Sequence, residues 1–162
     1  MHTELVKNIA ELLQKSGKTV SAAESCTGGL ISANFTALAG SSAYYLGSVT
    51  SYANSVKINV LGVDPSIIET FGAVSSECVA QMVEGVRKIT GSDFAIATSG
   101  IAGPGGGSEE KPVGLVWIGY SSANGTKTFK KVFNHDRSGN IEAFAGSALE
   151  IFLNQIKSEL TI

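Results

Sequence analysis

The sequence is poor in the residues that build metal centres, disulfide frameworks and charged binding surfaces. Its 162 residues include two cysteines, two histidines and three prolines, and charged residues make up 16% of the chain. Cys26 and Cys78 give neither a disulfide framework nor a metal-ligand spacing. The net charge is −2, whereas proteins that bind nucleic acids or anionic membranes usually carry an excess of basic residues. We therefore expect no metal, no other cofactor, no nucleic-acid partner and no membrane partner.

Long hydrophobic runs are also missing. No stretch reaches the roughly 20 apolar residues that a bilayer-spanning helix needs. The first residues, Met1–Lys7, do not show a basic segment followed by an apolar one, which is the pattern of a secretory signal. These features predict a reduced, cytoplasmic protein.

Apolar residues and glycine are abundant. Hydrophobic residues make up 43% of the chain, and 19 residues are glycine. A chain of this length can enclose one sizeable core, so residues 1–162 are expected to form a single domain. The many glycines indicate tight loops, which is where α/β domains hold their functional residues.

The hydrophobic periodicity alternates between helix and strand patterns and then shows two consecutive strands. A strong turn signal, Asn124-Gly125, joins these two as a hairpin. This order predicts an α/β fold: a three-layer α/β/α sandwich on a mixed, mostly parallel sheet of about five strands with one antiparallel strand. The predicted helices cover residues 3–15, 28–38, 54–61, 75–89 and 140–160, with a short one beginning at Pro65, and the predicted strands cover 19–23, 44–52, 93–98, 113–121 and 127–133.

The turn after the first predicted strand is the first candidate site. It reads Glu24-Ser-Cys-Thr-Gly-Gly29 and leads directly into a predicted helix. A helix N-terminus offers free N–H groups and the positive end of the helix dipole, and glycines let a ligand approach the backbone. The turn therefore suits an anion, or a nucleophile with an oxyanion hole. A simple helix cap by Ser25 or Thr27 is the alternative, which the turn by itself leaves open.

As a nucleophile, Ser25 needs a base, and a lysine is the best candidate. A Gly-x-Ser-x-Gly elbow is absent, and His135 is the only plausible histidine for a Ser/His/Asp triad. Cys26 ranks below Ser25, because a catalytic thiolate usually needs a histidine beside it. Tyr52 ends the second predicted strand and Lys57 follows it, and the end of this strand shares a sheet edge with Ser25. Burial would lower the pKa of Lys57 toward that of a base, and Tyr52 could relay a proton, but an exposed helix lysine is the simpler interpretation of Lys57 alone.

A glycine-rich loop between the third and fourth predicted strands is the second candidate site. Its Gly103-Pro-Gly-Gly-Gly107 segment can wrap a phosphate or a sugar, although it has neither the Walker A nor the Rossmann spacing. Lys111 and Arg137 are the cations that can hold a phosphate there, and arginine matches phosphate better with its forked donors. Taken singly, each of these cations is more often an ordinary surface charge.

Several segments occur together in one order. They are Glu24-Ser-Cys-Thr-Gly-Gly29, Gly40-Ser-Ser42, Ser51-Tyr-Ala-Asn-Ser-Val-Lys57, Leu61-Gly-Val63, Gly72-Ala-Val-Ser75, Ser99-Gly-Ile-Ala-Gly-Pro104 and Gly106-Gly-Ser-Glu-Glu-Lys-Pro-Val-Gly114. In combination they resemble the CinA C-terminal domain family, the stand-alone nicotinamide mononucleotide deamidases, over nearly the whole chain. Relatives often carry a second arginine shortly after the one that matches Arg137, and this chain does not.

The resemblance implies an α/β/α fold and hydrolysis of the nicotinamide carboxamide of a small nucleotide, with release of ammonia. It implies a Ser–Lys amidohydrolase without metal or other cofactor, with Ser25 as nucleophile, Lys57 as base and Tyr52 as their polar partner. We expect the oxyanion to be held by backbone N–H groups at residues 26–28 and the ribose phosphate by Arg137 and the glycine loop. The expected substrate-binding residues are Cys26, Thr27, Gly28, Gly29, Gly103, Gly105, Gly106 and Arg137.

Two alternatives stay open. A non-catalytic nucleotide-binding or interaction module would use the same glycine loop and helix N-terminus without a base, and an amidase could act on a different nucleotide-like amide. In each case the expected partners are a small nucleotide and further copies of this chain in a homo-oligomer.

Overall fold

The computed structural model describes residues 1–160, which form one five-stranded sheet flanked by helices. The elements in chain order are α1 (Thr3–Ser16), β1 (Val20–Glu24), α2 (Leu30–Thr36), η1 (Ser41–Ala43), β2 (Tyr45–Thr50), α3 (Asn54–Asn59), α4 (Pro65–Phe71), α5 (Ser76–Thr90), β3 (Phe94–Gly100), β4 (Leu115–Ser122), β5 (Gly125–Val132) and α6 (Arg137–Glu159). None of the helices in this described part is both long and apolar enough to cross a bilayer.

The sheet has the order β2-β1-β3-β4-β5. β1 pairs in parallel with both β2 and β3, while β4 pairs antiparallel with β3 and β5. Four strands therefore run in one direction and β4 runs against them, which confirms the predicted mixed sheet with one antiparallel strand. The hairpin between β4 and β5 pairs Ser122 with Gly125, next to the predicted turn.

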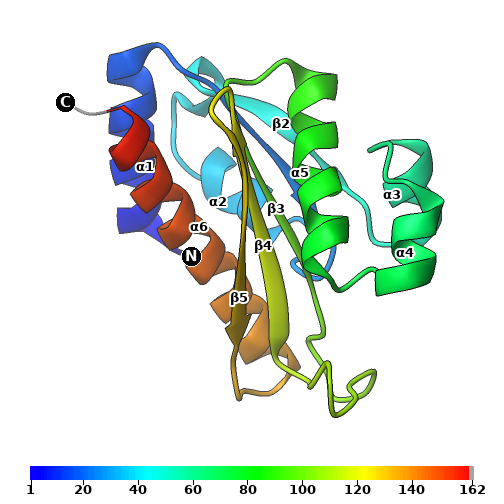
Figure 1. The fold of residues 1–162 in the computed structure, drawn as a ribbon. Helices are drawn as coiled ribbons and strands as arrows, with labels where there is room; N and C mark the ends of the chain where they lie inside the picture. The colour runs from blue at the N-terminus through cyan, green and yellow to red at the C-terminus, as the bar shows by residue number, and fades with distance from the viewer. Residues whose placement is uncertain (161–162) are drawn as a thin grey trace.

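Helices cover both faces of the sheet, so the predicted three layers are confirmed (Figure 1). α1, α2 and α6 lie on one face, where Phe35, Phe144 and Phe152 are fully buried in a core with residues of β1, β3 and β4. α5 lies on the other face with α3 and α4 beyond it, and its apolar stripe of Val79, Met82, Val83 and Val86 is fully buried. The periodicity of α5 was sufficient to predict this stripe.

The last helix begins earlier than the sequence pattern predicts. α6 begins at Arg137 instead of residue 140, because the Asp136 side chain accepts a hydrogen bond from the N–H of Gly139 and caps the first turn. Ser138 and Gly139 have weaker helix propensity than most residues, so propensity does not predict this first turn of α6. Arg137 therefore lies on the first turn of a helix, where its backbone is fixed.

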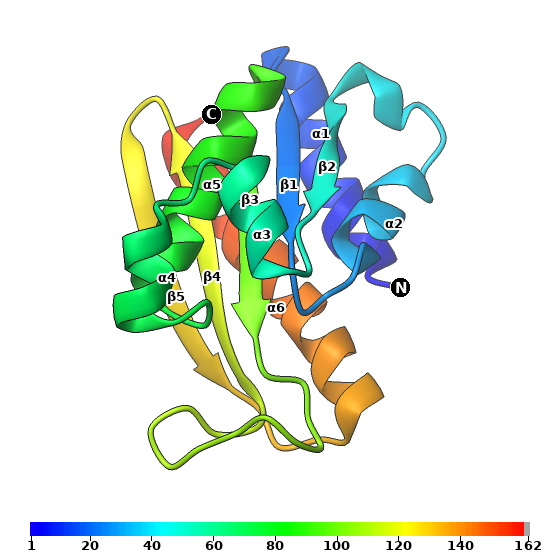
Figure 2. The same cartoon turned by 90° about the vertical axis from the view of Figure 1, so that its right-hand side faces the viewer.

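The carboxyl ends of β1, β2 and β3 meet at one edge of the sheet, and these three strands point toward the bottom of Figure 2. The chain leaves β1 toward β2 on one side, and β3 lies on the other side of β1. Such a change of direction opens a crevice between the loops that follow the two central strands, the usual place for a ligand in an open α/β sheet. Here these loops are the turn after Glu24 and the glycine-rich loop after Gly100.

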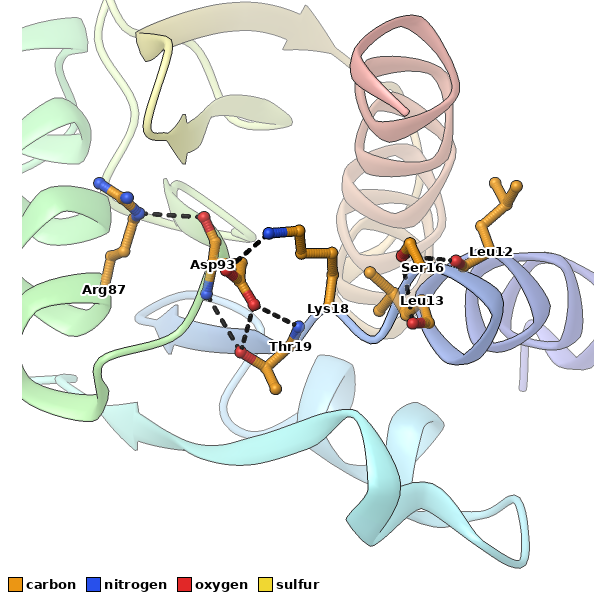
Figure 3. Close-up of polar contacts among 7 residues, drawn as sticks. All are labelled: Leu12, Leu13, Ser16, Lys18, Thr19, Arg87 and Asp93. Atoms are coloured by element: carbon orange, nitrogen blue, oxygen red, sulfur yellow. Dashed lines mark hydrogen bonds and ion pairs between the residues drawn. The ribbon is translucent and has the colours of Figure 1, made fainter. Parts of the chain in front are cut away.

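The opposite edge of the sheet is fastened by Asp93, which precedes β3 (Figure 3). Its carboxylate accepts hydrogen bonds from the N–H and the hydroxyl of Thr19 at 3.0 and 3.1 Å, and from Lys18 Nζ at 3.3 Å. The Arg87 guanidinium donates to the Asp93 carbonyl at 3.1 Å. Partial burial acts to raise the pKa of Asp93, but the bonds from Thr19 and Lys18 outweigh it together and hold that pKa below its usual value. Asp93 therefore joins the starts of β1 and β3 far from the crevice.

Candidate active site

Ser25 lies at the first bend after β1, at the bottom of the crevice. Its N–H donates to the Thr98 carbonyl of β3 at 3.1 Å, and its carbonyl accepts from the N–H of Gly28 at 3.1 Å. The backbone is thus held on both sides of the serine, and the residue is only 9% exposed. This geometry also corrects one expectation: the Gly28 N–H is used inside the turn. Among residues 1–160, the N–H groups of Cys26 and Thr27 donate to no other residue, and the N–H of Cys26 directly follows Ser25.

The N-terminus of α2 is occupied by a side chain of the protein. The fully buried carboxylate of Glu24 accepts from the N–H groups of Ile31 at 2.8 Å and Ser32 at 3.0 Å. It also accepts from the hydroxyl of Thr27 at 2.6 Å. The sequence-based expectation that this helix end is open to an external anion is therefore wrong, because Glu24 already uses the donors. Glu24 was missed as a functional candidate, although an acidic residue closing an otherwise uncharged buried strand is a readable signal.

Lys57 reaches the serine from α3. Its Nζ lies 3.0 Å from Ser25 Oγ, 2.7 Å from the Ser51 carbonyl oxygen and 3.2 Å from the Tyr52 carbonyl oxygen. The lysine is only 1% exposed, and the described residues give it no carboxylate partner within ion-pair distance. The interpretation of Lys57 as an exposed helix lysine is therefore wrong.

These three oxygens define what the amine can do. Two of them are carbonyl oxygens, which only accept hydrogen bonds. A neutral amine has two N–H groups, so when it donates both to these carbonyls its lone pair is left to accept from the Ser25 hydroxyl. Burial favours this neutral form, because desolvation lowers the pKa of Lys57 below its usual value, against smaller opposing effects of Cys78 and Cys26. The arrangement is that of a base already in contact with a hydroxyl.

The two cysteines beside this pair are poor nucleophiles. Burial raises the pKa of Cys26 to about 12, so its thiol keeps its proton at neutral pH. Burial likewise raises the pKa of Cys78, which is fully buried at the start of α5. The chemistry that these residues offer therefore rests on the hydroxyl of Ser25.

Tyr52 contacts the site in a different way from the one expected. Its carbonyl accepts from Lys57, but its side chain is 63% exposed and its hydroxyl accepts from Arg137 Nη2 at 3.2 Å. Arg137 Nη1 donates to the carbonyl of Gly103 at 2.7 Å. The phenol thus lies with the arginine at the mouth of the crevice, and it makes no hydrogen bond to Ser25 or Lys57.

A cavity of about 280 Å³ connects these groups. Of the predicted residues, it is lined by Ser25, Lys57, Tyr52, Cys26, Gly103, Gly105, Gly106 and Arg137. Thr27, Gly28 and Gly29 do not line it. The Thr27 hydroxyl turns to Glu24, and the two glycines with φ of +60° and +103° carry the chain around to α2. They shape the turn and lie outside the cavity.

One wall of the cavity was missed at the sequence level. Ala73 and Val74, in the connection between α4 and α5, line the cavity together with residues of the glycine-rich loop. The hydroxyl of Ser99 holds this wall by donating to the Ala73 carbonyl at 2.8 Å, and Lys111 holds it by donating to the Phe71 carbonyl. Lys111 therefore fastens the loop to α4 and does not line the cavity. Within residues 1–160, no three His, Cys, Asp or Glu side chains gather as a metal site would require.

Comparison with known proteins shows the family of this chain. The family model described as the CinA C-terminal domain matches residues 2–156. The chain belongs to the CinA C-terminal domain family. Its sequence is 49% identical over 142 residues to a CinA-like protein of Salinibacter ruber, covering 88% of this chain and 34% of that protein. It is 53% identical over 129 residues to a CinA-like protein of Fervidobacterium nodosum, covering 80% of this chain and 32% of that protein.

The chain thus spans about a third of the length of these curated relatives. Solved structures of the family match it over nearly their whole length. The competence damage-inducible protein A (ComA) of Klebsiella pneumoniae superposes with a TM-score of 0.93 at 34% identity, covering 96% of each chain. The competence/damage inducible protein CihA of Agrobacterium tumefaciens superposes with a TM-score of 0.90 at 42% identity, covering 94% of this chain and 95% of that one. These neighbours share the fold and the family of this chain.

Proposed function

We propose that this chain is an amidohydrolase that converts the carboxamide of nicotinamide mononucleotide to the acid and ammonia through a covalent Ser25 intermediate. The observation that carries the proposal is the buried Lys57 amine, 3.0 Å from the Ser25 hydroxyl and without a carboxylate partner among the described residues. A purely structural lysine seldom stays so deeply buried without a carboxylate, because burying an ionised amine is costly. Hydrolysis of an amide uses a base in this position.

The first half of the reaction is acyl transfer. The neutral Lys57 amine takes the proton of the Ser25 hydroxyl while Oγ attacks the carboxamide carbon. The Cys26 N–H donates to the oxyanion that forms, and losing such a donor typically costs about 3–4 kcal/mol of barrier. When the tetrahedral species collapses, the C–N bond breaks and the Lys57 ammonium returns its proton to the leaving nitrogen, which departs as ammonia.

The second half releases the acid. Lys57 is neutral again after ammonia has left, and it takes a proton from a water that attacks the acyl carbon. The bond between Ser25 Oγ and the acyl carbon breaks, and Oγ recovers the proton from Lys57. One amide and one water have become one acid and one ammonia, with Ser25 and Lys57 unchanged.

The mouth of the cavity suits the ribose phosphate of such a substrate. Arg137 is exposed there and directs two guanidinium donors to neutral oxygens, the Gly103 carbonyl and the Tyr52 hydroxyl. A phosphate accepts from the same donors as a charge-assisted and therefore stronger partner. The loop glycines Gly105 and Gly106 carry no side chain that would keep a sugar from the backbone. The cavity of about 280 Å³ is close to the roughly 300 Å³ lower limit of small-molecule sites.

Ammonia release from nicotinamide mononucleotide, measured with EDTA present, tests the proposal. Ser25→Ala should abolish release and still bind the nucleotide in calorimetry, whereas Ser55→Ala, on the exposed side of α3, should behave like the wild type. Full activity of Ser25→Ala would exclude the covalent route. Binding without any ammonia from the wild type would instead favour a non-catalytic nucleotide-binding module.

A further inference from the structure

A fully buried asparagine holds two segments that border the cavity. Asn140, on the first turns of α6, has no exposed surface. Its Nδ2 donates to the Ala102 carbonyl and to the His135 carbonyl, both at 3.0 Å, and its Oδ1 accepts from the His135 N–H at 3.1 Å. Both amide donors and the acceptor of this side chain are used, so it has one satisfied orientation.

The two segments that it joins carry the mouth of the cavity. Ala102 lines the cavity and precedes Gly103, whose carbonyl accepts from Arg137. His135 lies two residues before Arg137. Asn140 and Arg137 therefore make two neighbouring connections between the glycine-rich loop and the start of α6, one buried and one exposed.

Arg137 depends on this connection for its position. Within residues 1–160, it forms no ion pair, and its guanidinium contacts only two neutral oxygens. A long exposed side chain held by two neutral acceptors is placed mainly by its backbone, because such contacts only modestly offset the rotamer entropy that they cost. Asn140 fixes the backbone of both segments that meet at the guanidinium, at Ala102 on one side and at His135 on the other.

We propose that Asn140 is a positioning residue that holds Arg137 and the Gly103 carbonyl in register for the phosphate end of the substrate. The proposal rests on the proposed function for its substrate, and its structural part stands without it. Replacement of the amide leaves the buried Ala102 carbonyl and the part-buried His135 carbonyl without their donor, and the two segments separate to reach water. Ser25, on the turn after β1, and Lys57, on α3, belong to other segments, so their geometry is kept.

The test compares Asn140→Leu with a matched variant, Asn34→Leu. Asn34 is also a buried asparagine, 2% exposed, and it bonds the Leu30 carbonyl and the His2 N–H away from the cavity. Hydrogen exchange of residues 101–106, followed by mass spectrometry, should accelerate at least about tenfold in Asn140→Leu and stay unchanged in Asn34→Leu. Equal exchange in both variants overturns the proposal. If Asn140→Leu does not fold, Asn140→Asp, which keeps the acceptor and loses both donors, takes its place.

Steady-state kinetics separate positioning of the substrate from a general loss of structure. Asn140→Leu should raise KM for nicotinamide mononucleotide about tenfold with kcat nearly unchanged, the result of losing a binding contact and not a reacting group. In an Arg137→Ala background the same replacement should leave KM unaltered, because the residue that it positions is gone. A fall in kcat alone, or an equal KM effect in both backgrounds, overturns the assigned role. A wild type that releases no ammonia refutes the proposed function, and the exchange comparison still decides whether Asn140 holds the two segments.

Discussion

The proton balance of Lys57 can be measured without any substrate, through the pH dependence of folding. Desolvation lowers the pKa of Lys57 in the folded protein, whereas in the unfolded chain the amine returns to a pKa of about 10.4. Between these two pKa values the unfolded state holds one proton more than the folded state. The free energy of unfolding therefore rises with pH across that window.

The size of this effect follows from one proton. The slope is at most about 1.4 kcal/mol for each pH unit inside the window, since one proton is the whole difference. Below the folded pKa the full cost of charging the buried amine is present, and above about pH 10.4 it is gone. With a urea m-value of about 2 kcal/mol/M, the slope moves the unfolding midpoint by about 0.7 M per pH unit.

Urea titrations from pH 6 to 10, followed by the fluorescence of Trp117, give the measurement. The quantity compared is the free energy of unfolding of the wild type minus that of Lys57→Met, a substitution of similar length that cannot titrate. The two buried thiols, whose pKa values burial raises, add a slope of opposite sign. Both proteins contain these thiols, so the difference removes their slope except for the smaller effect of the Lys57 charge on their pKa values. Lys88→Met, which replaces an exposed lysine of α5, is the control and should follow the wild type at every pH.

The difference between the wild type and Lys57→Met should grow steadily in favour of the wild type as the pH rises. A flat difference would mean that Lys57 holds its proton equally in both states, and Ser25 would then have no base at neutral pH. The same titration should appear in catalysis. The ratio kcat/KM for nicotinamide mononucleotide should rise with pH through the folded pKa of Lys57, because the free enzyme needs the neutral amine.

Three further changes test the framework around the site. Glu24→Ala leaves the Thr27 hydroxyl and two N–H groups of α2 without their acceptor and should lower the free energy of unfolding by about 2–4 kcal/mol. Urea unfolding measures this loss, and an unchanged unfolding midpoint would refute the role of Glu24 in holding the turn. The pKa of Asp93 is lowered in the folded protein, so the stability that this carboxylate contributes is complete above about pH 4 and is lost as the pH falls through that folded pKa. The melting temperature of Asp93→Asn between pH 5 and 2 should therefore depend less on pH than that of the wild type, and parallel curves would contradict this prediction. Gly114→Ala would place a Cβ against the Phe133 carbonyl oxygen and should lower the melting temperature far more than Gly125→Ala, where a Cβ meets open space at a similar positive φ. Calorimetry compares the two variants, and equal losses of melting temperature would refute the clash.

Much of the fold could be predicted because local patterns and tertiary packing agree. The apolar stripe of α5, the hairpin between β4 and β5 and the mixed sheet all follow from periodicity and turn chemistry. The same reasoning brought Ser25 and Lys57 to one sheet edge, because they follow neighbouring parallel strands. Their separation of 3.0 Å depends on the bend at Ser25 and on the depth of α3, which no local pattern reports.

The remaining features of the site depend on contacts between distant segments. The phenol of Tyr52 turns to Arg137 across 85 positions of the sequence. The Ala73–Val74 wall is fixed by Ser99 of β3 and by Lys111 of the glycine-rich loop. Residue types alone suggested Tyr52 as a partner of Ser25 and left Lys111 as a candidate phosphate ligand beside the better matched Arg137. In both cases a polar partner brought close by the fold decided the orientation instead: the Arg137 guanidinium, which donates to the Tyr52 hydroxyl, and the Phe71 carbonyl, which accepts from Lys111.

The surroundings of Lys57 also determine where its proton can go. The Ser51 and Tyr52 carbonyls accept two hydrogen bonds from the amine whether it is neutral or charged. The proton taken from Ser25 therefore occupies the third position, which points back at Ser25 Oγ and at whatever is bonded to it. In the proposed reaction that position faces the leaving nitrogen, so the fixed carbonyls direct the proton without a further acid. Because Glu24 already uses the donors at the N-terminus of α2, this ammonium and the Cys26 N–H are the donors that the proposed reaction assigns to the oxyanion. Burial strengthens the few charges that such a site uses.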